Sequence, residues 1–350
     1  MPAMSNTSAI DANTRSLCVL LPSWVGDTVM ATGLLRACAI QHPQTKIQVV
    51  VRPGLGSLLE GLPYISAIFE ARMKGSVGPL RCARKIKESK SDAVLVLPNS
   101  FRSALIARLS GIRKRIGYAR DRRGFLLTDA MTVPEHKGPI SLLDYYQHLA
   151  TFAFGKRPDD MTPGLTVTAE QLQDSKALLC ESDRPLIILN PGGNRMAKRW
   201  PAEKFIELAL LLKSEHGVEF AITGSPAEAE LVSQIAQAIP DSTDLTAKGL
   251  SLATLKGVIS RASLMITNDT GPRHIAAALG TPVVTLFGPT DHRWTTLPGV
   301  KERLLIAEPF LPEELVADHH ADLCHVDRIT THDVFVNAQA LLCETQATRS

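Results

Sequence analysis

Asp27 is the first residue of this sequence whose position suggests chemistry. It stands alone between an apolar, strand-like run at residues 16–22 and an amphipathic helical pattern at 27–42. A carboxylate at the start of a helix can serve only to cap the first turn. In parallel α/β proteins, however, chemistry gathers at the carboxyl ends of the strands, where Asp27 would also lie. The sequence therefore leaves two interpretations of Asp27, a helix cap and a catalytic carboxylate.

A second polar turn lies within ITNDTGPRHIAAALGTPVVTLFGPTD, residues 266–291. An apolar strand runs into Asp269, Thr270 and Gly271, and Pro272 then suits the first turn of a helix. Free backbone N–H groups at such a helix start bind anions, and Thr270 and Gly271 permit close approach by a phosphate. Asp269 would accept hydrogen bonds from sugar hydroxyls. These residues predict a nucleotide-sugar site, and the alternative is that Asp269 and Thr270 only cap the helix.

Two further strand-to-helix turns carry candidate donor-binding residues. The turn NPGGNRMAKRW, residues 190–200, has glycines that let the backbone approach a ligand, and its candidates are Gly193, Asn194 and Lys198. Its spacing matches neither the dinucleotide fingerprint nor the P-loop. In TGSPAEAE, residues 223–230, Glu228 either complements the helix dipole or binds ribose hydroxyls.

The stretch GIRKRIGYARDRRG, residues 111–124, contains six basic residues and the single acid Asp121. Arginine pairs bidentately with phosphate, so this run predicts an anion site for an acidic acceptor. The candidate acceptor-binding residues are Arg120, Arg122 and Arg123. The alternative is a solvated loop. Tyr118 is the one aromatic residue of the run, and this does not favour nucleic-acid binding.

The histidines suggest a metal site, which the spacing does not support. Four candidate ligands cluster near the end of the chain, His319, His320, Cys324 and His325, but they match no standard zinc pattern. We therefore expect no metal and no other cofactor. His274 lies in the helix after the Asp269 turn, where it is either a buried structural residue or a donor contact.

These turns need parallel strands to position them, and the sequence supplies two such sets. Near-continuous apolar runs alternate with helical patterns over residues 16–160 and again over 185–338. We interpret residues 161–184, with one short helix, as the interdomain linker. Residues 1–15 are predicted to be a disordered tail and 339–350 a frayed C-terminal tail. The fold class is therefore α/β, with two Rossmann-like domains facing across a cleft.

Composition agrees with this class. The chain has 350 residues, 45% hydrophobic and 5% aromatic, with a net charge of +3 that does not by itself imply nucleic acid. Six cysteines are scattered without a CxxC pair, as in a reduced cytosolic protein. The polar N-terminus lacks the apolar core of a signal peptide, and no apolar run is long enough to span a bilayer. We expect a cytoplasmic protein, with attachment to a membrane surface left open.

The motifs LPSWVGDTVMATGLLRA, NPGGNRMAKRWP, GSPAE and NDTGPRHIAAALGTPVVTLFGPTD together resemble the ADP-heptose:lipopolysaccharide heptosyltransferases, over about residues 16–335. The SWVGD form is most similar to the type II members. The resemblance implies a GT-B fold whose C-terminal domain binds the donor. It further implies metal-independent, inverting transfer of L-glycero-D-manno-heptose from ADP-heptose to the lipopolysaccharide inner core, as the second heptose. The acceptor would be a Kdo- or heptose-bearing lipid A at the cytoplasmic face of the inner membrane.

The resemblance also implies roles for individual residues. Asp27 matches the family's catalytic carboxylate, Lys198 its diphosphate-binding lysine, and the turn 269–271 its donor loop. Glu228 matches the ribose-binding acid less closely. Many relatives have Leu-Met where this chain has Pro272-Arg273, a departure that bears on donor and acceptor identity.

Three other functions are compatible with parts of this pattern. The chain could be a related glycosyltransferase with another acceptor or nucleotide sugar, a noncatalytic nucleotide-sugar-binding protein, or another two-domain enzyme such as a sugar-nucleotide epimerase. The presence of Asp27 and Lys198 argues against a noncatalytic protein. Release of ADP together with a heptosylated acceptor would separate these possibilities.

Overall fold

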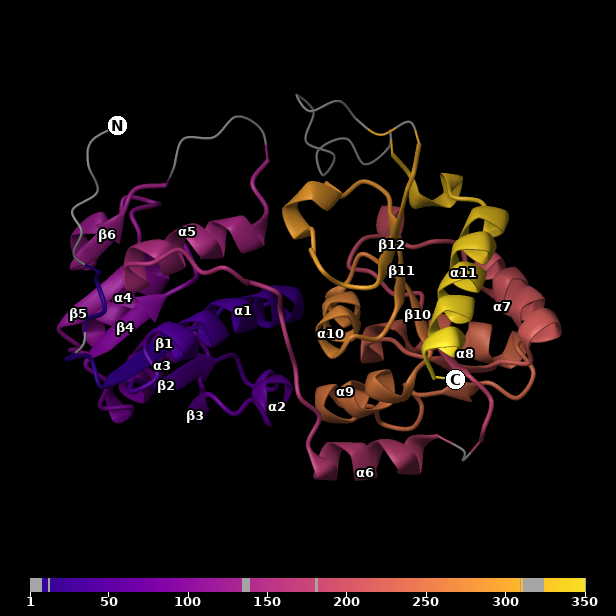
Figure 1. Ribbon diagram of the computed structural model, residues 1–350, viewed down its shortest axis with the longest axis horizontal. Helices are drawn as coiled ribbons and strands as arrows, with labels where there is room; N and C mark the ends of the chain where they lie inside the picture. The colour runs from indigo at the N-terminus through magenta and orange to yellow at the C-terminus, as the bar shows by residue number, and fades with distance from the viewer. Residues whose placement is uncertain are drawn as a thin grey trace. The chain divides into compact units, whose positions relative to one another are not determined.

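The computed structural model describes residues 8–11, 13–133, 139–179, 182–308, 310 and 324–349. The chain divides into two compact units, Met1–Thr166 and Val167–Ser350 (Figure 1). Each unit contains one six-stranded sheet in which every pairing is parallel. This confirms the predicted fold class of two Rossmann-like domains.

The sheet of the first unit has the order β3-β2-β1-β4-β5-β6. Its strands are β1 (Ser16–Leu20), β2 (Lys46–Val51), β3 (Ile65–Glu70), β4 (Ala93–Val96), β5 (Lys114–Tyr118) and β6 (Asp129–Met131). The order reverses between β1 and β4, and ligands of such sheets bind beyond the carboxyl ends of the strands at this reversal. The segment that leads from β1 to Asp27 lies at that point.

Helices cover this sheet because its strands are apolar on both faces. They are α1 (Val25–Gln41), α2 (Gly56–Leu59), α3 (Gly78–Glu88), α4 (Phe101–Leu109), the 3-10 turn η1 (Gly124–Leu126) and α5 (Leu142–Phe154). Cys18 and Leu20 of β1 join a core cluster with α3 and α4. Leu17 and Val19 alternate with them and are equally buried. Helix α1 packs against α5.

The start of the described chain differs from the predicted disordered tail. Ile10 is fully buried, and its N–H donates to the carbonyl oxygen of Ala153 at 2.7 Å. The Ala9 N–H makes a similar bond to Phe152 at 3.4 Å. The prediction overlooked that Ala9 and Ile10 can bury apolar surface beside the end of α5. Residues 1–7 and 12 lie outside the described residues.

The sheet of the second unit repeats the pattern in the order β12-β11-β10-β7-β8-β9. Its strands are β7 (Leu186–Asn190), β8 (Glu219–Ile222), β9 (Thr243–Asp244), β10 (Leu264–Asn268), β11 (Val283–Phe287) and β12 (Glu302–Ile306). Here the order reverses between β7 and β10. The turns that follow these two strands are the predicted donor loops, 190–200 and 269–271, so topology brings them together.

The helices of the second unit are α6 (Ala169–Leu178), α7 (Ala202–His216), α8 (Ala229–Ala238), α9 (Leu252–Arg261), α10 (Gly271–Leu279) and α11 (Thr331–Arg349). Short 3-10 turns are η2 (Met196–Lys198), η3 (Pro226–Glu228), η4 (His292–Thr295) and η7 (Val326–Arg328). Trp200 and Phe205 belong to the core cluster of this unit and meet edge to face at 4.9 Å.

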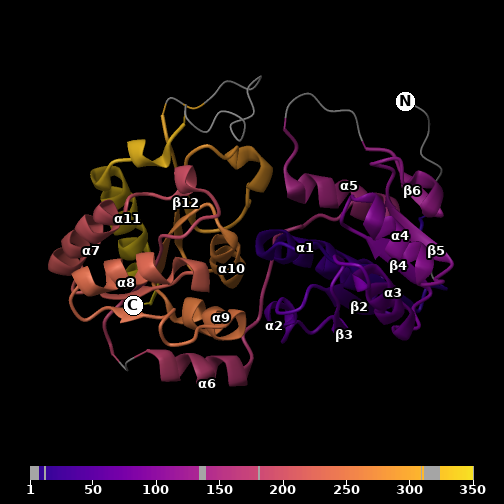
Figure 2. The same cartoon turned by 180° about the vertical axis from the view of Figure 1, so that it is seen from behind.

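Two segments of the second unit differ from the predicted domain anatomy. Helix α6, placed in the predicted linker 161–184, lies along α9 (Figures 1 and 2), where Gly257 leaves room for the Gln171 carbonyl. Helix α11 continues into the predicted tail 339–350 and ends at Arg349. Leu341 and Leu342 are buried in the core cluster, so apolar packing against α7 extends this helix.

Within the described ranges, no helix is both long and apolar enough to cross a membrane. The five described cysteines are unpaired, and four of them are buried. Cys180 lies outside the described residues.

Candidate functional site

Asp27 lies in the first turn of α1, one strand-to-helix turn beyond β1. Trp24 is the N-cap residue, and no side chain donates or accepts a capping hydrogen bond there. Asp27 itself has no hydrogen-bond or ion-pair partner among the residues that the structure describes. The capping interpretation therefore finds no support, and the half-buried carboxylate remains available to a ligand.

Burial raises the pKa of the Asp27 carboxyl to about 6. The helix dipole acts in the opposite direction, but desolvation dominates because the carboxylate has no compensating donor. The buried Tyr146 of α5 lies close enough for the Asp27 charge to contribute to the raised pKa of its phenol. A carboxylate whose pKa lies near neutrality is well suited to accept a proton during a reaction.

A cavity of about 560 Å³ opens at the same edge of the first sheet. Its lining comes from the segments that follow β1, β2 and β3: Ser23, Trp24, Arg52, Pro53, Arg72, Met73, Lys74 and Gly75. Three cations line it and no acid does, and none of these cations has an ion pair in the described part of the chain. The cavity therefore favours an anionic ligand.

This cationic cavity was not predicted from the sequence. The signal was present, because Arg52 directly follows β2 and Arg72 follows β3 by two residues. Each charge alone looks like an ordinary solvated side chain. The parallel register of β1, β2 and β3 brings them to one edge.

The predicted acceptor residues Arg120, Arg122 and Arg123 do not share one environment. Arg120 and Arg122 are exposed, whereas Arg123 is fully buried. Arg123 Nε donates to the Tyr118 carbonyl at 2.8 Å, and Nη1 donates to Ser103 Oγ at 2.9 Å and to the Pro98 carbonyl.

Arg123 thus ties the end of β5 to the segment after β4. Its guanidinium is occupied inside the unit, so the prediction that it contacts the acceptor is corrected to a structural role. Arg120 and Arg122 stay predictions.

In the second unit, the two predicted donor loops meet through a charge pair. Lys198 Nζ lies 3.6 Å from Asp269 Oδ2, and the two side chains are 12% and 11% exposed. Arg273 Nη1 lies 3.6 Å from the other oxygen of Asp269. Asp269 therefore stands between two cations from different elements, with little access to water.

Helix α10 begins at Gly271, two residues after Asp269, and lacks a side-chain cap. Thr270 is its N-cap residue, but its hydroxyl accepts no capping bond from the helix. It lies instead 2.6 Å from Asn190 Nδ2, which donates to it. The N–H groups of Gly271 and Arg273 at this helix start are thus not taken by a cap, which favours binding of an anion. The interpretation of Asp269 and Thr270 as capping residues alone is not supported.

Glu228 has both carboxylate oxygens engaged within the unit. Oε1 accepts from the Gly193 N–H at 2.7 Å, and Oε2 accepts from the Ser225 N–H and hydroxyl at 2.8 Å each. A Cβ on Gly192 would come within 2.5 Å of this carboxylate, so any larger residue there would displace it. Glu228 thus caps η3 and holds the 190–200 loop, while a ribose contact stays a prediction.

The remaining predicted donor residues lie at the same edge. Asn194 is exposed, and its side chain has no partner among the described residues. His274 is 5% exposed, and its Nδ1 makes no hydrogen bond. Burial, with the Arg273 charge, holds the pKa of His274 well below its usual range, so its ring is neutral. Donor binding by either residue stays a prediction.

The part of the chain that the structure describes contains no group of three or more His, Cys, Asp or Glu side chains that could hold a metal ion. His319 and His320 lie outside the described residues. The expectation of metal independence therefore stays a prediction.

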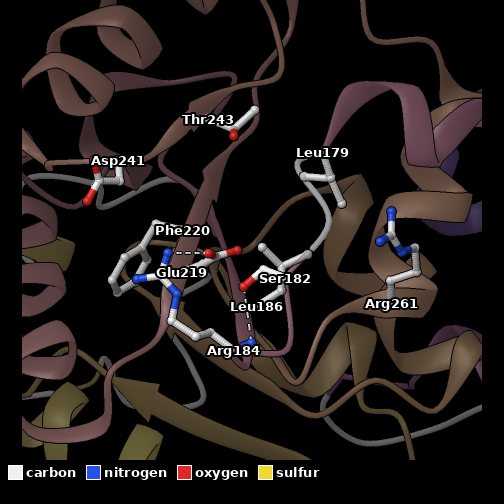
Figure 3. Close-up of a pocket in the computed structure, with 9 residues that line it drawn as sticks. All are labelled: Leu179, Ser182, Arg184, Leu186, Glu219, Phe220, Asp241, Thr243 and Arg261. Atoms are coloured by element: carbon white, nitrogen blue, oxygen red, sulfur yellow. Dashed lines mark hydrogen bonds and ion pairs between the residues drawn. The ribbon is translucent and has the colours of Figure 1, made fainter.

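A smaller cavity, of about 300 Å³, lies at the opposite edge of the second sheet, where β7, β8 and β9 begin. Figure 3 shows Arg184 paired with Glu219, while Arg261 stands apart on the far wall. The cavity shares no residue with the donor loops, and we assign it no part in the donor site.

Comparison with known proteins identifies relatives over most of the chain. The family model described as glycosyltransferase family 9 (heptosyltransferase) matches residues 80–309. Lipopolysaccharide heptosyltransferase 2 of Salmonella typhimurium is 30% identical over 302 residues, which cover 82% of this chain and 86% of that protein.

Two solved structures agree with this relationship. E. coli ADP-heptose LPS heptosyltransferase II is similar with a TM-score of 0.78 at 27% identity, over 95% of this chain and 99% of that one. A family 9 glycosyl transferase from Veillonella parvula gives a TM-score of 0.84 at 20% identity, over 97% and 100% of the two chains, and supports the fold alone.

Proposed function

Because this chain belongs to glycosyltransferase family 9, we propose that it transfers L-glycero-D-manno-heptose from ADP-heptose to the lipopolysaccharide inner core, as the second heptose. The observation that carries the proposal is the 30% identity with lipopolysaccharide heptosyltransferase 2 over 82% of the chain. The chain is a glycosyltransferase, and the side chains at its two sheet edges suit the two halves of this reaction.

Asp27 is the general base of the proposed reaction. It accepts the proton of the acceptor hydroxyl, whose oxygen then bonds to the anomeric carbon of the heptose. The bond from that carbon to the β-phosphate oxygen breaks, and its electron pair leaves with ADP, so the anomeric centre inverts. The raised pKa of Asp27, about 6, supports this role, because the carboxylate is ionised at neutral pH and still basic enough to take the proton.

Lys198 and the uncapped start of α10 stabilise the departing ADP. The diphosphate gains negative charge as the glycosidic bond breaks, and preorganised donors at that position lower the barrier. Lys198 supplies a full charge, and the N–H groups of Gly271 and Arg273 supply partial charges. With these donors the reaction proceeds without a metal ion.

The acceptor is a Kdo- or heptose-bearing lipid A at the cytoplasmic face of the inner membrane, where the protein binds peripherally. Its acidic groups enter the cavity lined by Arg52, Arg72 and Lys74, which supports an anionic acceptor. Arg120 and Arg122 are exposed on the same unit and attract the anionic lipid surface.

The test is a donor and acceptor screen with product analysis. The chain is incubated with ADP-heptose, ADP-glucose or UDP-N-acetylglucosamine, and with lipid A that bears Kdo alone or Kdo and one heptose. We expect ADP release and a mass increase of one heptose, with ADP-heptose and the heptose-bearing acceptor. Product on the Kdo-only acceptor would assign the first heptose instead, and ADP-heptose binding without product would identify a noncatalytic protein. An isomerised nucleotide sugar without ADP release would identify an epimerase.

A further inference from the structure

Arg273, in the first turn of α10, is a fully buried cation. Its guanidinium donates from Nε to Glu302 Oε1 at 2.6 Å and from Nη2 to Glu302 Oε2 at 3.0 Å. Nη1 donates to Thr295 Oγ1 at 2.9 Å, and the guanidinium carbon lies 4.9 Å from the centre of the Phe287 ring. A bidentate carboxylate and a ring face are the partners that a buried arginine needs.

Glu302 is already a sufficient counter-charge for Arg273. It is the first residue of β12, its side chain is 5% exposed, and Thr285 Oγ1 also donates to it at 2.5 Å. The further approach of Arg273 Nη1 to Asp269, at 3.6 Å, is therefore not required to neutralise the arginine. The contact instead stabilises the negative charge of the Asp269 carboxylate.

Four charges alternate along this chain of contacts, in the order Lys198, Asp269, Arg273 and Glu302. In the proposed function, Lys198 binds the diphosphate of the donor. A lysine that turns toward a diphosphate can no longer neutralise Asp269. Since Asp269 is 11% exposed, water alone would compensate its charge poorly, and Arg273 is then its remaining cationic neighbour among the described residues.

We propose that Arg273 is a positioning residue that holds the Asp269 carboxylate toward the sugar of the donor while Lys198 serves the diphosphate. In this proposal Arg273 itself contacts neither the donor nor the acceptor. Its rigid attachment to Glu302 and Thr295 fixes where Asp269 points, so that Asp269 accepts hydrogen bonds from sugar hydroxyls. This inference rests on the proposed function, since it requires a nucleotide-sugar donor in the second unit.

The inference separates two ligands that share a nucleotide. ADP has no sugar beyond its diphosphate and does not use Asp269 as an acceptor. ADP-heptose does use it. Loss of Arg273 must therefore weaken binding of ADP-heptose more than binding of ADP, whereas a purely structural role would affect both ligands alike.

The test uses variants that remove Arg273 without leaving its partner charged. Arg273→Met alone would leave Glu302 buried and unpaired, so the main variant is Arg273→Met with Glu302→Gln. The single variant Glu302→Gln, which keeps Arg273, is the matched control. Isothermal titration calorimetry measures the Kd of ADP and of ADP-heptose for each protein, and Tm reports folding.

We expect the double variant to bind ADP within about twofold of the wild type and ADP-heptose about tenfold more weakly, a difference of about 1.4 kcal/mol. The control should keep the wild-type ratio of the two constants, because the glutamine oxygen can still accept from Arg273 and the bond to Thr295 is retained. An unchanged ratio in a folded double variant, or an equal loss for both ligands, overturns the inference.

If the double variant does not fold, Arg273→Lys carries the same test. It keeps the charge but has a single nitrogen, which cannot bind Glu302 and Thr295 and also approach Asp269, so the same change in the ratio is expected. A wild-type chain that binds neither ligand defeats the proposed function and the inference with it. A wild-type chain that binds both ligands, with an unchanged ratio in the variants, defeats the inference alone.

Discussion

Asn190 Nδ2 donates to Thr270 Oγ1 across 2.6 Å and to Thr267 Oγ1 across 2.8 Å, and so joins the end of β7 to the N-cap of α10. A reciprocal link runs from Asn268 Nδ2 to the carbonyls of Pro191 and Gly192, at 2.8 and 3.0 Å. The last residue of each strand thus holds the loop that follows its neighbour. The two donor loops form one unit at the point where the strand order reverses.

We therefore expect Asn190→Ala to weaken both the fold and ADP binding. The substitution removes one hydrogen bond from each of the Thr267 and Thr270 hydroxyls, which keep only their 3.2 Å contact with each other and the Thr267 bond to the Asn268 carbonyl, at a cost of about 1–3 kcal/mol in unfolding free energy. Urea denaturation and calorimetry with ADP measure the two effects. Asn337→Ala, at a partly exposed asparagine of α11 that bonds only to the Asp333 carbonyl of its own helix, is the control and should change neither. Unaltered ADP affinity in Asn190→Ala would show that the link does not support the donor site.

Asp27→Asn should fold normally and bind ADP normally but lose transfer. Removal of a general base typically lowers kcat by about 10²–10⁴-fold. Steady-state kinetics and calorimetry with ADP check both parts. Asp144→Asn is a matched control, because Asp144 also lies in the first turn of a helix, where it accepts from Ser141. A near-normal kcat in Asp27→Asn would contradict the catalytic assignment.

The pKa of Asp27, about 6, also sets the expected pH dependence of activity. The base must be ionised, so kcat/KM should rise with pH and level off above about 6. The phenol of neighbouring Tyr146 has its pKa raised by burial and does not titrate in this range. A pH–rate profile from pH 4.5 to 8.5 measures this. The absence of an inflection near 6 would indicate that Asp27 is not the group that limits the rate at low pH.

The same shift predicts an effect on stability. The pKa of Asp27 is about 6 when folded and about 3.9 when unfolded, so the folded state binds the proton more tightly. Stability is therefore lost as pH rises from about 4 to about 6, and the loss persists above that range. The free energy of unfolding of Asp27→Asn should exceed that of the wild type by up to about 2–3 kcal/mol at pH 7.5 and by almost nothing at pH 4. Urea unfolding at both pH values measures the difference, and an equal effect at both would contradict it.

Lys198→Ala should weaken the binding of ADP and of ADP-heptose by about 10–100-fold and leave the binding of adenosine unchanged. The reason is that a hydrogen bond to a charged group contributes about 1.5–3 kcal/mol. Calorimetry with the three ligands measures this. Lys213→Ala, which removes a lysine paired with Asp241, is the control. Equal losses for adenosine and ADP would remove the diphosphate role. Wild-type activity should also persist in EDTA, and its loss there would contradict metal independence.

The sequence predicted most of the strands and the candidate turns that follow them, because both depend on neighbouring residues. Apolar runs of four to six residues mark strands such as β1, β7 and β10, whereas β6 and β9 have three and two residues, contain no such run and were not predicted. The donor loops were found for the same reason, since glycine, proline and a polar residue follow each run.

What could not be predicted depends on contacts between distant residues. Arg123 belongs to a basic run that is typical of a solvated loop. It is nevertheless buried, because backbone carbonyls of the segment after β4 accept hydrogen bonds from its guanidinium. Arg273 and Glu302 are 29 residues apart, and their pairing requires the registers of β10, β11 and β12. The cationic cavity likewise combines three segments, none of which is distinctive alone.

The final prediction concerns the acceptor and separates two basic surfaces of the first unit. Arg52→Ser with Arg72→Ser removes two charges from the cavity, and Arg120→Ser with Arg122→Ser removes two from the exposed run. Arg81→Ser with Arg84→Ser, on exposed positions of α3, makes the same change in net charge elsewhere and serves as the control.

The cavity pair should raise the acceptor KM about tenfold or more, both with acceptor in anionic vesicles and with the delipidated oligosaccharide, because it contacts the sugar acids themselves. The exposed pair should raise KM with the vesicles alone, and salt well above 0.1 M, where the screening length falls below about 10 Å, should abolish its effect. Donor KM should stay unchanged in all three pairs. Steady-state kinetics with each substrate varied in turn, at two salt concentrations, measures these values. If the exposed pair matches the control, residues 120 and 122 form a solvated loop, and if the cavity pair matches it, the acceptor binds through other residues near Asp27.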